Sequence, residues 1–131
     1  MRFSHFFTIL AAQLLLSTAT AQSCTSQGPG SCNLGLGGTL YDDDKTKIFW
    51  EWVIIYDHFC NEIGVEVNPY QGQLLKSKLP MEVELTSLVF HGDWRSFGMC
   101  YGDYCFSGTM ACAFEGDEWN NCQHAFPCPG F

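Results

Sequence analysis

The strongest helix-like pattern of hydrophobic positions lies between Lys45 and Ile63. Its apolar residues recur with the spacing of one helical face, at Phe49, Trp52, Val53, Tyr56, Cys60 and Ile63. Three aspartates at positions 42–44 precede the segment and Gly64 follows it, as suits the two ends of a helix. Residues 48–56 are also rich in strand-forming side chains. Length and end signals favour a helix over a strand here.

Strand-like alternation follows in the second half of the chain. Residues 81–91 alternate between two faces, and residues 94–101 continue as a second predicted strand. Gly102-Asp103 is flanked symmetrically by two tyrosines and then by Cys100 and Cys105, which predicts a two-residue hairpin and a third strand over residues 104–114. Cys100 then opposes Cys105. The two cysteines either bond to each other or bond to different partners, and the pattern leaves both open.

The remaining segments are predicted as loops. Residues 22–38 are rich in Ser, Gly, Gln and Pro, residues 39–41 suit a short strand, and residues 65–80 read as a connection. The tail after Phe114 is predicted as a loop secured by Cys122 and Cys128. The expected fold class is α+β, with one main helix packed on an antiparallel sheet of three to four strands and stapled by four disulfides.

The first 21 residues have the three parts of a secretory signal peptide. Arg2 is basic, residues 6–16 are apolar, and Ala19-Thr20-Ala21 supplies small residues for cleavage. We therefore expect residues 1–21 to be removed and residues 22–131 to form a single secreted domain. All eight cysteines follow this leader, and an even number in a short secreted chain predicts four disulfides. They are Cys24, Cys32, Cys60, Cys100, Cys105, Cys112, Cys122 and Cys128.

The charge balance narrows the range of partners. The chain has 6 basic and 14 acidic residues and a net charge of −8. Such a surface repels phosphate backbones and anionic lipid, so no nucleic acid and no membrane is expected as a partner. No Cys-x-x-Cys pair occurs, and Glu115, Asp117 and Glu118 match no calcium-loop spacing. We expect a monomer without metal or cofactor.

Catalytic motifs are weak. A guanyl-specific fungal ribonuclease needs a carboxylate base, a histidine acid and an arginine on one sheet face, for which Glu82 or Glu84, His91 and Arg95 are the candidates. Glu84 and His91 are seven residues apart, so a regular strand places them on opposite faces. No Gly-x-Ser-x-Gly or His-Glu-x-x-His motif is present. We expect no enzymatic activity, and ribonuclease-like activity is the strongest catalytic alternative.

The overall format resembles the small cysteine-rich secreted proteins of plant-associated filamentous fungi. Within that group, one helix followed by an antiparallel sheet is similar to the disulfide-bridged avirulence-protein family of Dothideomycete pathogens, whose members carry a Trp-Arg-aromatic motif in a strand. Trp94-Arg95 is present, but Ser96 stands at the aromatic position and Phe97 follows. The resemblance implies virulence through surface contact with a host protein or plant immune receptor, in the apoplast or after translocation into host cells.

Two other classes stay open. The loop from Cys24 to Cys32, with Gly30-Ser31, is similar to the opening of killer-toxin-like proteins and implies antimicrobial activity. A carbohydrate-binding wall protein would use exposed aromatic side chains as stacking platforms. Because loop tips on rigid scaffolds often carry recognition, the candidate contact residues sit near the predicted hairpin and the Trp-Arg pair. These residues are Trp94, Arg95, Tyr101, Asp103 and Tyr104.

Overall fold

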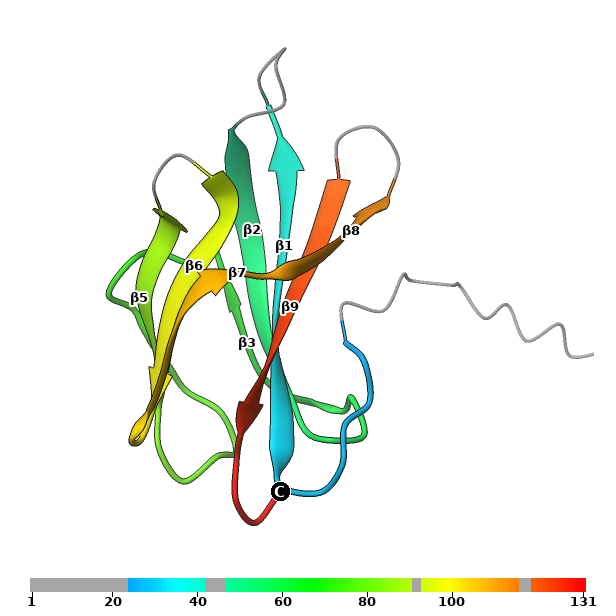
Figure 1. The fold of residues 1–131 in the computed structure, drawn as a ribbon, viewed down its shortest axis with the longest axis vertical. Coiled ribbons are helices and arrows are strands. Elements are labelled where there is room, and N and C mark those ends of the chain that lie inside the picture. Colours follow the sequence, from blue (N-terminus) through cyan, green and yellow to red (C-terminus); the bar gives the residue numbers. More distant parts are fainter. Residues whose placement is uncertain (1–23, 42–46, 91–92, 116–118) are drawn as a thin grey trace, which may run out of the picture.

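Two antiparallel sheets face each other in a β-sandwich (Figure 1). The computed structural model describes residues 24–41, 47–90, 93–115 and 119–131. One sheet has the strand order β3-β2-β1-β9-β8 and the other the order β4-β5-β6-β7. The strands are β1 (Ser31–Leu40), β2 (Ile48–Tyr56), β3 (Glu62–Val67), β4 (Leu74–Leu75), β5 (Val83–Phe90), β6 (Asp93–Tyr101), β7 (Tyr104–Thr109), β8 (Ala111–Glu115) and β9 (Trp119–Pro127).

The predicted α+β class is wrong, because the described ranges contain no helix. Consequently none of their segments is a helix that is long and apolar enough to cross a membrane. The segment predicted as the main helix forms β2 and β3 instead. The register between β1 and β2 shifts at Gly37/Gly38, where β2 contains one extra residue, Glu51. This bulge turns the two-residue period of a strand into a three-residue step, so that Trp50 and Val53 both face the core. The step resembles helical spacing.

Residues 31–40 and 119–127, most of which are predicted as loops, form central strands of the five-stranded sheet. β1 lies between β2 and β9, and β9 lies between β1 and β8. Leu34, Leu36 and Leu40 of β1 are buried in the core. Glycine and amide residues disfavour a strand locally, but pairing on both sides supplies the backbone hydrogen bonds and the burial that the segments lack by themselves.

The hairpin prediction is confirmed. Tyr101 pairs with Tyr104 and Cys100 with Cys105 across the turn, where Gly102 has a φ of 56°. The strands predicted on either side correspond to β5, β6 and β7. The single strand predicted over residues 104–114 is divided, because buried Met110 carries the chain from β7 in one sheet to β8 in the other.

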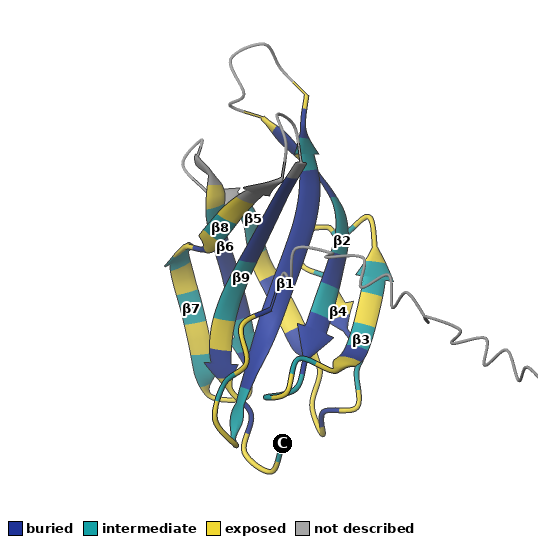
Figure 2. Cartoon of the chain, turned by 90° about the vertical axis from the view of Figure 1, so that its right-hand side faces the viewer, coloured by how far each residue is buried: buried dark blue, intermediate teal, exposed yellow. Residues whose placement is uncertain are grey.

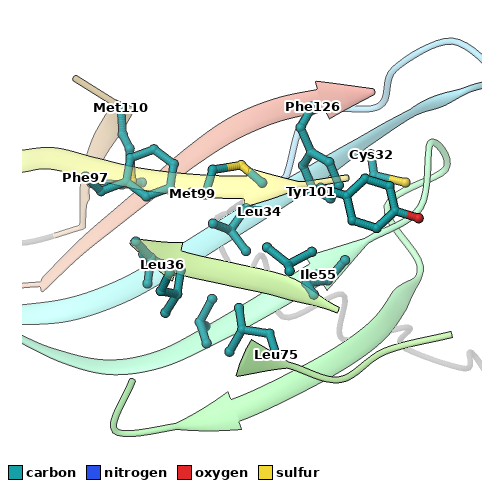
Figure 3. Packing of buried hydrophobic residues seen from close by; sticks show 14 of the residues in the cluster. Cys32, Leu34, Leu36, Ile55, Leu75, Phe97, Met99, Tyr101, Met110 and Phe126 are labelled. Atoms are coloured by element: carbon teal, nitrogen blue, oxygen red, sulfur yellow. The ribbon is translucent and has the colours of Figure 1, made fainter. Parts of the chain in front are cut away.

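The core fills the space between the sheets (Figure 3). Leu34, Leu36 and Ile55 come from the five-stranded sheet and meet Phe97 and Met99 of the four-stranded sheet; all five are at most 1% exposed. Complete burial of an aliphatic or aromatic side chain contributes about 1.5–3 kcal/mol relative to exposure. Within the described ranges, seven strands, β1 to β6 and β9, contribute buried residues to this core, so the sandwich is held by contacts between distant segments and not by local structure.

All eight cysteines are paired, as expected. The bonds are Cys24–Cys60, Cys32–Cys128, Cys100–Cys105 and Cys112–Cys122. Cys24–Cys60 ties the segment before β1 to the turn after β2, and Cys32–Cys128 joins the start of β1 to the chain after β9. Four disulfides indicate an oxidising environment such as the extracellular space.

Candidate binding surface

The outer face of the five-stranded sheet changes character from one edge to the other. The register aligns Val67, Trp52, Gly37, Asn121 and Ala113 in one row across β3, β2, β1, β9 and β8. A second row aligns Val65, Ile54, Gly35, Gln123 and Ala111. The β3 and β2 positions are bulky and apolar, the β1 positions are glycine, and the β9 positions are amides.

We name the apolar part of this face the apolar stripe. Val65 and Val67 of β3 are 56% and 69% exposed, and Phe49 of β2 is 53% exposed. Trp52 and Ile54 lie between them on β2 and are half-buried. Exposed apolar side chains that adjoin one another are typical of interaction surfaces, whereas scattered ones are ordinary. The apolar stripe consists of Phe49, Trp52, Ile54, Val65 and Val67.

Trp52 is held flat on the sheet because the opposed residue is glycine. A Cβ atom at Gly37 would lie 2.1 Å from both Cε2 and Cζ2 of the Trp52 indole. No side chain can occupy that position without displacing the ring. The indole is thus seated before any partner binds, and little side-chain entropy remains to be lost on binding.

The N-terminal segment Cys24–Gln27, which we call the strap, covers another part of the same face (Figure 2). Asn33 Nδ2 donates to the Thr25 carbonyl at 2.7 Å. The Thr25 N–H donates to Gln123 Oε1, and Gln123 Nε2 donates to Thr25 Oγ1, each at 2.7 Å. The strap therefore occupies the β1 and β9 positions, while the exposed valines remain at the β3 edge.

The turn after β2 anchors the strap. The Asp57 carboxylate accepts hydrogen bonds from the Phe59 N–H, the Asn61 N–H and Asn61 Nδ2 at 2.9–3.0 Å. Burial by itself raises the pKa of Asp57. These hydrogen bonds and the neighbouring His58 together lower it by a larger amount, so the pKa lies below its usual value. The ordered turn presents the His58 carbonyl to the Gln27 N–H at 3.0 Å and Cys60 to Cys24.

The candidate contact residues predicted from the sequence do not form one surface. Arg95 is exposed near the start of β6, and Asp103 is exposed at the turn beyond its other end. Tyr101 is 4% exposed and packs edge-to-face on Phe126, with ring centroids 5.5 Å apart. Its side chain belongs to the core and not to the hairpin tip. The backbone of Trp94 lies in β6, and its side chain lies outside the described part.

Tyr104 takes part in a different cluster, which is partly buried at the β7 edge of the core. Its hydroxyl lies 2.9 Å from Nε2 of His124 in β9. Phe106 stacks on the same imidazole, with centroids 3.6 Å apart, and Phe97 meets its edge at 5.6 Å. Burial lowers the pKa of His124. No sequence pattern indicates this cluster, because the segment that forms β9 is predicted as a loop.

Within the described ranges, the candidate residues for catalysis and metal binding do not lie together in one site. Glu82 and Glu84 are exposed, and Arg95 is exposed on β6. Three further candidates lie outside the described residues, namely His91, Asp117 and Glu118, and Glu115 is the last residue of β8. No group of three or more His, Cys, Asp or Glu side chains able to hold a metal ion occurs within the described ranges.

The sequence pattern predicts the residues of the apolar stripe in other structures. It places Phe49 and Trp52 on one face of a helix, and Val65 and Val67 in a connection. Only the pairing of Trp52 with Val67 and of Ile54 with Val65 brings the four side chains together. In comparisons with known proteins, no family model, no curated protein and no solved structure matches this chain.

Proposed function

We propose that this is a secreted binding protein of the effector type, which acts by protein–protein contact through the apolar stripe. The observation that carries the proposal is the exposure of Val65, Val67 and Phe49 beside the seated indole of Trp52. Protein interfaces place aromatic and aliphatic anchors at their centre and surround them with polar groups. The stripe supplies such a centre on paired strands.

Rigidity supports this use of the stripe. β2 is paired on both sides, by β1 and β3, and the strap is tied to the turn that follows β2 by the Cys24–Cys60 disulfide. A preorganised surface loses less conformational freedom on association than a mobile loop does. At the hairpin tip, by contrast, Asp103 is the only candidate residue that is exposed. The side chain of Tyr101 is buried in the core.

A host-directed role is the finer part of the proposal. It is supported by the predicted leader, by the four disulfides suited to the extracellular space, and by the resemblance in format to secreted effectors of plant-associated fungi. The expected partner is a host protein or an immune receptor. The acidic body of the molecule, with a net charge of −8, favours a partner whose rim is basic.

Glycan binding is the second candidate, because an indole seated flat on a sheet is a suitable stacking platform for a sugar ring. A sugar also needs several polar groups beside the platform for its hydroxyls. The neighbours of Trp52 toward β3 are valines, and Asn121 in the same row is 6% exposed. The surroundings of Trp52 therefore favour an apolar protein surface over a sugar.

The proposal is tested by infiltrating purified protein into plant leaves and measuring cell death and immune response against dose. Val65→Lys/Val67→Lys places two charges on exposed positions at the β3 edge of the stripe, so the fold is retained. We expect at least a tenfold loss of potency. The matched control is Leu74→Lys/Met81→Lys, which makes the same chemical change at two residues that are 55% and 50% exposed away from the stripe.

Each outcome has a definite meaning. Loss of response in the stripe variant with retention in the control supports the proposal. Equal potency of the stripe variant and the wild-type protein excludes the stripe as the contact surface. Absence of any response to the wild-type protein contradicts the host-directed role. Retention of the wild-type protein on insoluble glucan or chitin, with loss of retention in Trp52→Ala, would favour glycan binding at the Trp52 platform instead.

A further inference from the structure

Two of the four disulfides join directly opposed residues of neighbouring strands. Cys100–Cys105 links β6 to β7, and Cys112–Cys122 links β8 to β9, with Cα–Cα distances of 4.1 and 4.0 Å. The two bonds differ in the face from which they project. Cys122 is fully buried in the core, whereas Cys100 alternates with buried neighbours and lies on the outer face of the four-stranded sheet.

Among the cysteines, exposure to solvent is concentrated at one of these bonds. Cys105 is exposed, and each of the other seven cysteines is buried or half-buried. Thiol–disulfide exchange begins with attack of a thiolate on one sulfur, so its rate depends on which sulfur a reagent can reach. Among the four bonds, Cys100–Cys105 is therefore the one with an open approach.

Opening this bond also has the smallest structural cost. Its two cysteines are 5 residues apart, against 96 for Cys32–Cys128, and a short closed loop constrains the unfolded chain least. The hairpin is held independently by backbone pairing of β6 with β7 from Ser96↔Thr109 to Tyr101↔Tyr104. Residues on the other face of β7 pack against the core. The sandwich therefore does not depend on this bond.

We propose that Cys100–Cys105 is a thiol–disulfide exchange site that reacts with a small uncharged dithiol while the fold stays intact. One thiolate of the dithiol attacks Cys105 Sγ, the bond to Cys100 breaks, and Cys100 leaves as a thiolate. The second thiol of the reagent then attacks the reagent sulfur that is bonded to Cys105. This closes the cyclic disulfide and releases Cys105 as a thiolate. Two electrons and two protons pass from the dithiol, which becomes a cyclic disulfide, to the two cysteines.

Charge near the bond favours an uncharged reagent over an acidic one. Glu84 of β5 is directly opposed to Cys100, and Asp103 is exposed in the turn. These carboxylates repel a thiol that carries additional negative charge, such as glutathione. For exposed charges a few ångströms apart in water, the expected effect on rate is about two- to threefold at low ionic strength.

The test uses the intact protein and dithiothreitol without denaturant. Newly formed thiols are alkylated at timed intervals and located by mass spectrometry, while circular dichroism follows the fold. We expect Cys100 and Cys105 to be labelled at least tenfold faster than any other pair, with an unchanged spectrum. Earlier labelling of another pair, or simultaneous labelling of all four pairs with loss of the spectrum, would overturn the proposal.

Two variants sharpen the result. Cys100→Ser/Cys105→Ser removes the early labelled pair and leaves the labelling of the other three bonds unchanged, whereas persistence of an early pair contradicts the assignment. Glu84→Gln is expected to raise the rate with glutathione about twofold more than the rate with dithiothreitol. An equal change in both rates would refute the role of charge in selecting the reagent.

Because this site lies on the other sheet, Val65→Lys/Val67→Lys is expected to react with dithiothreitol like the wild-type protein.

Discussion

At the scale of single residues, Gly37 has the clearest role. Its neighbour across the strands is Trp52, whose ring occupies the space that a Cβ atom would need. A glycine in a strand interior usually weakens the strand, and this one instead permits close approach of an aromatic ring to the backbone. The residue at position 37 therefore decides how the indole of the apolar stripe is presented.

Gly37→Ala is expected to lower the free energy of unfolding by about 1–3 kcal/mol, because the added methyl group forces the Trp52 ring from its position. Urea titration followed by circular dichroism measures the change. Gly28→Ala is the matched control, since no atom lies within 4 Å of a Cβ built there and it is expected to have little effect. In a Trp52→Ala background most of the cost of Gly37→Ala should disappear. A full cost in that background would contradict this account.

The same scale shows why contact residues were hard to predict. Tyr101 and Tyr104 are equivalent in the sequence, one on each side of Gly102-Asp103. The pairing of β6 with β7 places Tyr101 in the core against Phe126 and places Tyr104 beside His124 at the partly buried edge of the core. The difference comes from contacts with β9, which supplies both Phe126 and His124. The residues next to each tyrosine in the chain contain no information about these contacts.

At the scale of elements, the strap and the bulge in β2 determine the outer face of the five-stranded sheet. The strap occupies the positions over Asn33 and Gln123, and the bulge brings Phe49 and Trp52 to the same face although they are three residues apart. Covering one part of the sheet leaves the β2–β3 part as its exposed apolar surface. The Cys24–Cys60 disulfide holds this division in place.

Cys24→Ser/Cys60→Ser is expected to lower the free energy of unfolding by about 3–4 kcal/mol, because the bond joins residues 36 positions apart. Amide hydrogen exchange should also accelerate selectively at Thr25 and Gln27, whose N–H groups are bonded to Gln123 and to the His58 carbonyl. Cys100→Ser/Cys105→Ser is the control. It should lower the free energy of unfolding by less, because the disulfide that it removes closes a shorter loop. Equal protection of the strap in both variants would show that its hydrogen bonds suffice without the disulfide.

At the scale of the whole molecule, the two sheets meet through the apolar core and, on one side, through the His124 cluster. His124 of β9 contacts Tyr104 and Phe106 of β7, so a titratable group lies between the sheets. The folded state favours the neutral imidazole because burial lowers the pKa of His124 below its usual 6.5. The resulting contribution to stability is complete above pH 6.5 and is lost as the pH falls through the pKa of the folded state.

The free energy of unfolding is therefore expected to decrease between pH 7.5 and pH 5.5, and the decrease should be smaller in His124→Gln. Urea titrations of both proteins at the two pH values measure the difference. His58→Gln is the control for loss of an imidazole, because His58 lies beside Phe59 in the turn after β2, away from the His124 cluster. An identical pH dependence in His124→Gln and wild-type protein would show that the cluster does not link protonation to folding.

The sequence by itself determined the features that depend on local pattern and composition. The hairpin at Gly102-Asp103, the strands on either side of it, and the full pairing of eight cysteines follow from turn chemistry, alternation and an even cysteine count. These features involve residues that are neighbours in the chain or a property of the whole chain. No knowledge of distant contacts is needed to infer them.

Only the tertiary structure decided the fold class and the candidate surface. β1 and β9 form the centre of a sheet because each pairs with its neighbour in the chain, β2 or β8, and the two pair with each other across the length of the domain. Pairing on both sides outweighs their weak local preference for a strand. The bulge in β2 imitated a helix because an extra residue changes the period. The apolar stripe exists because β2 pairs with β3 in a register that sets Trp52 beside Val67, and register is a property of the pair of strands and not of either sequence segment alone.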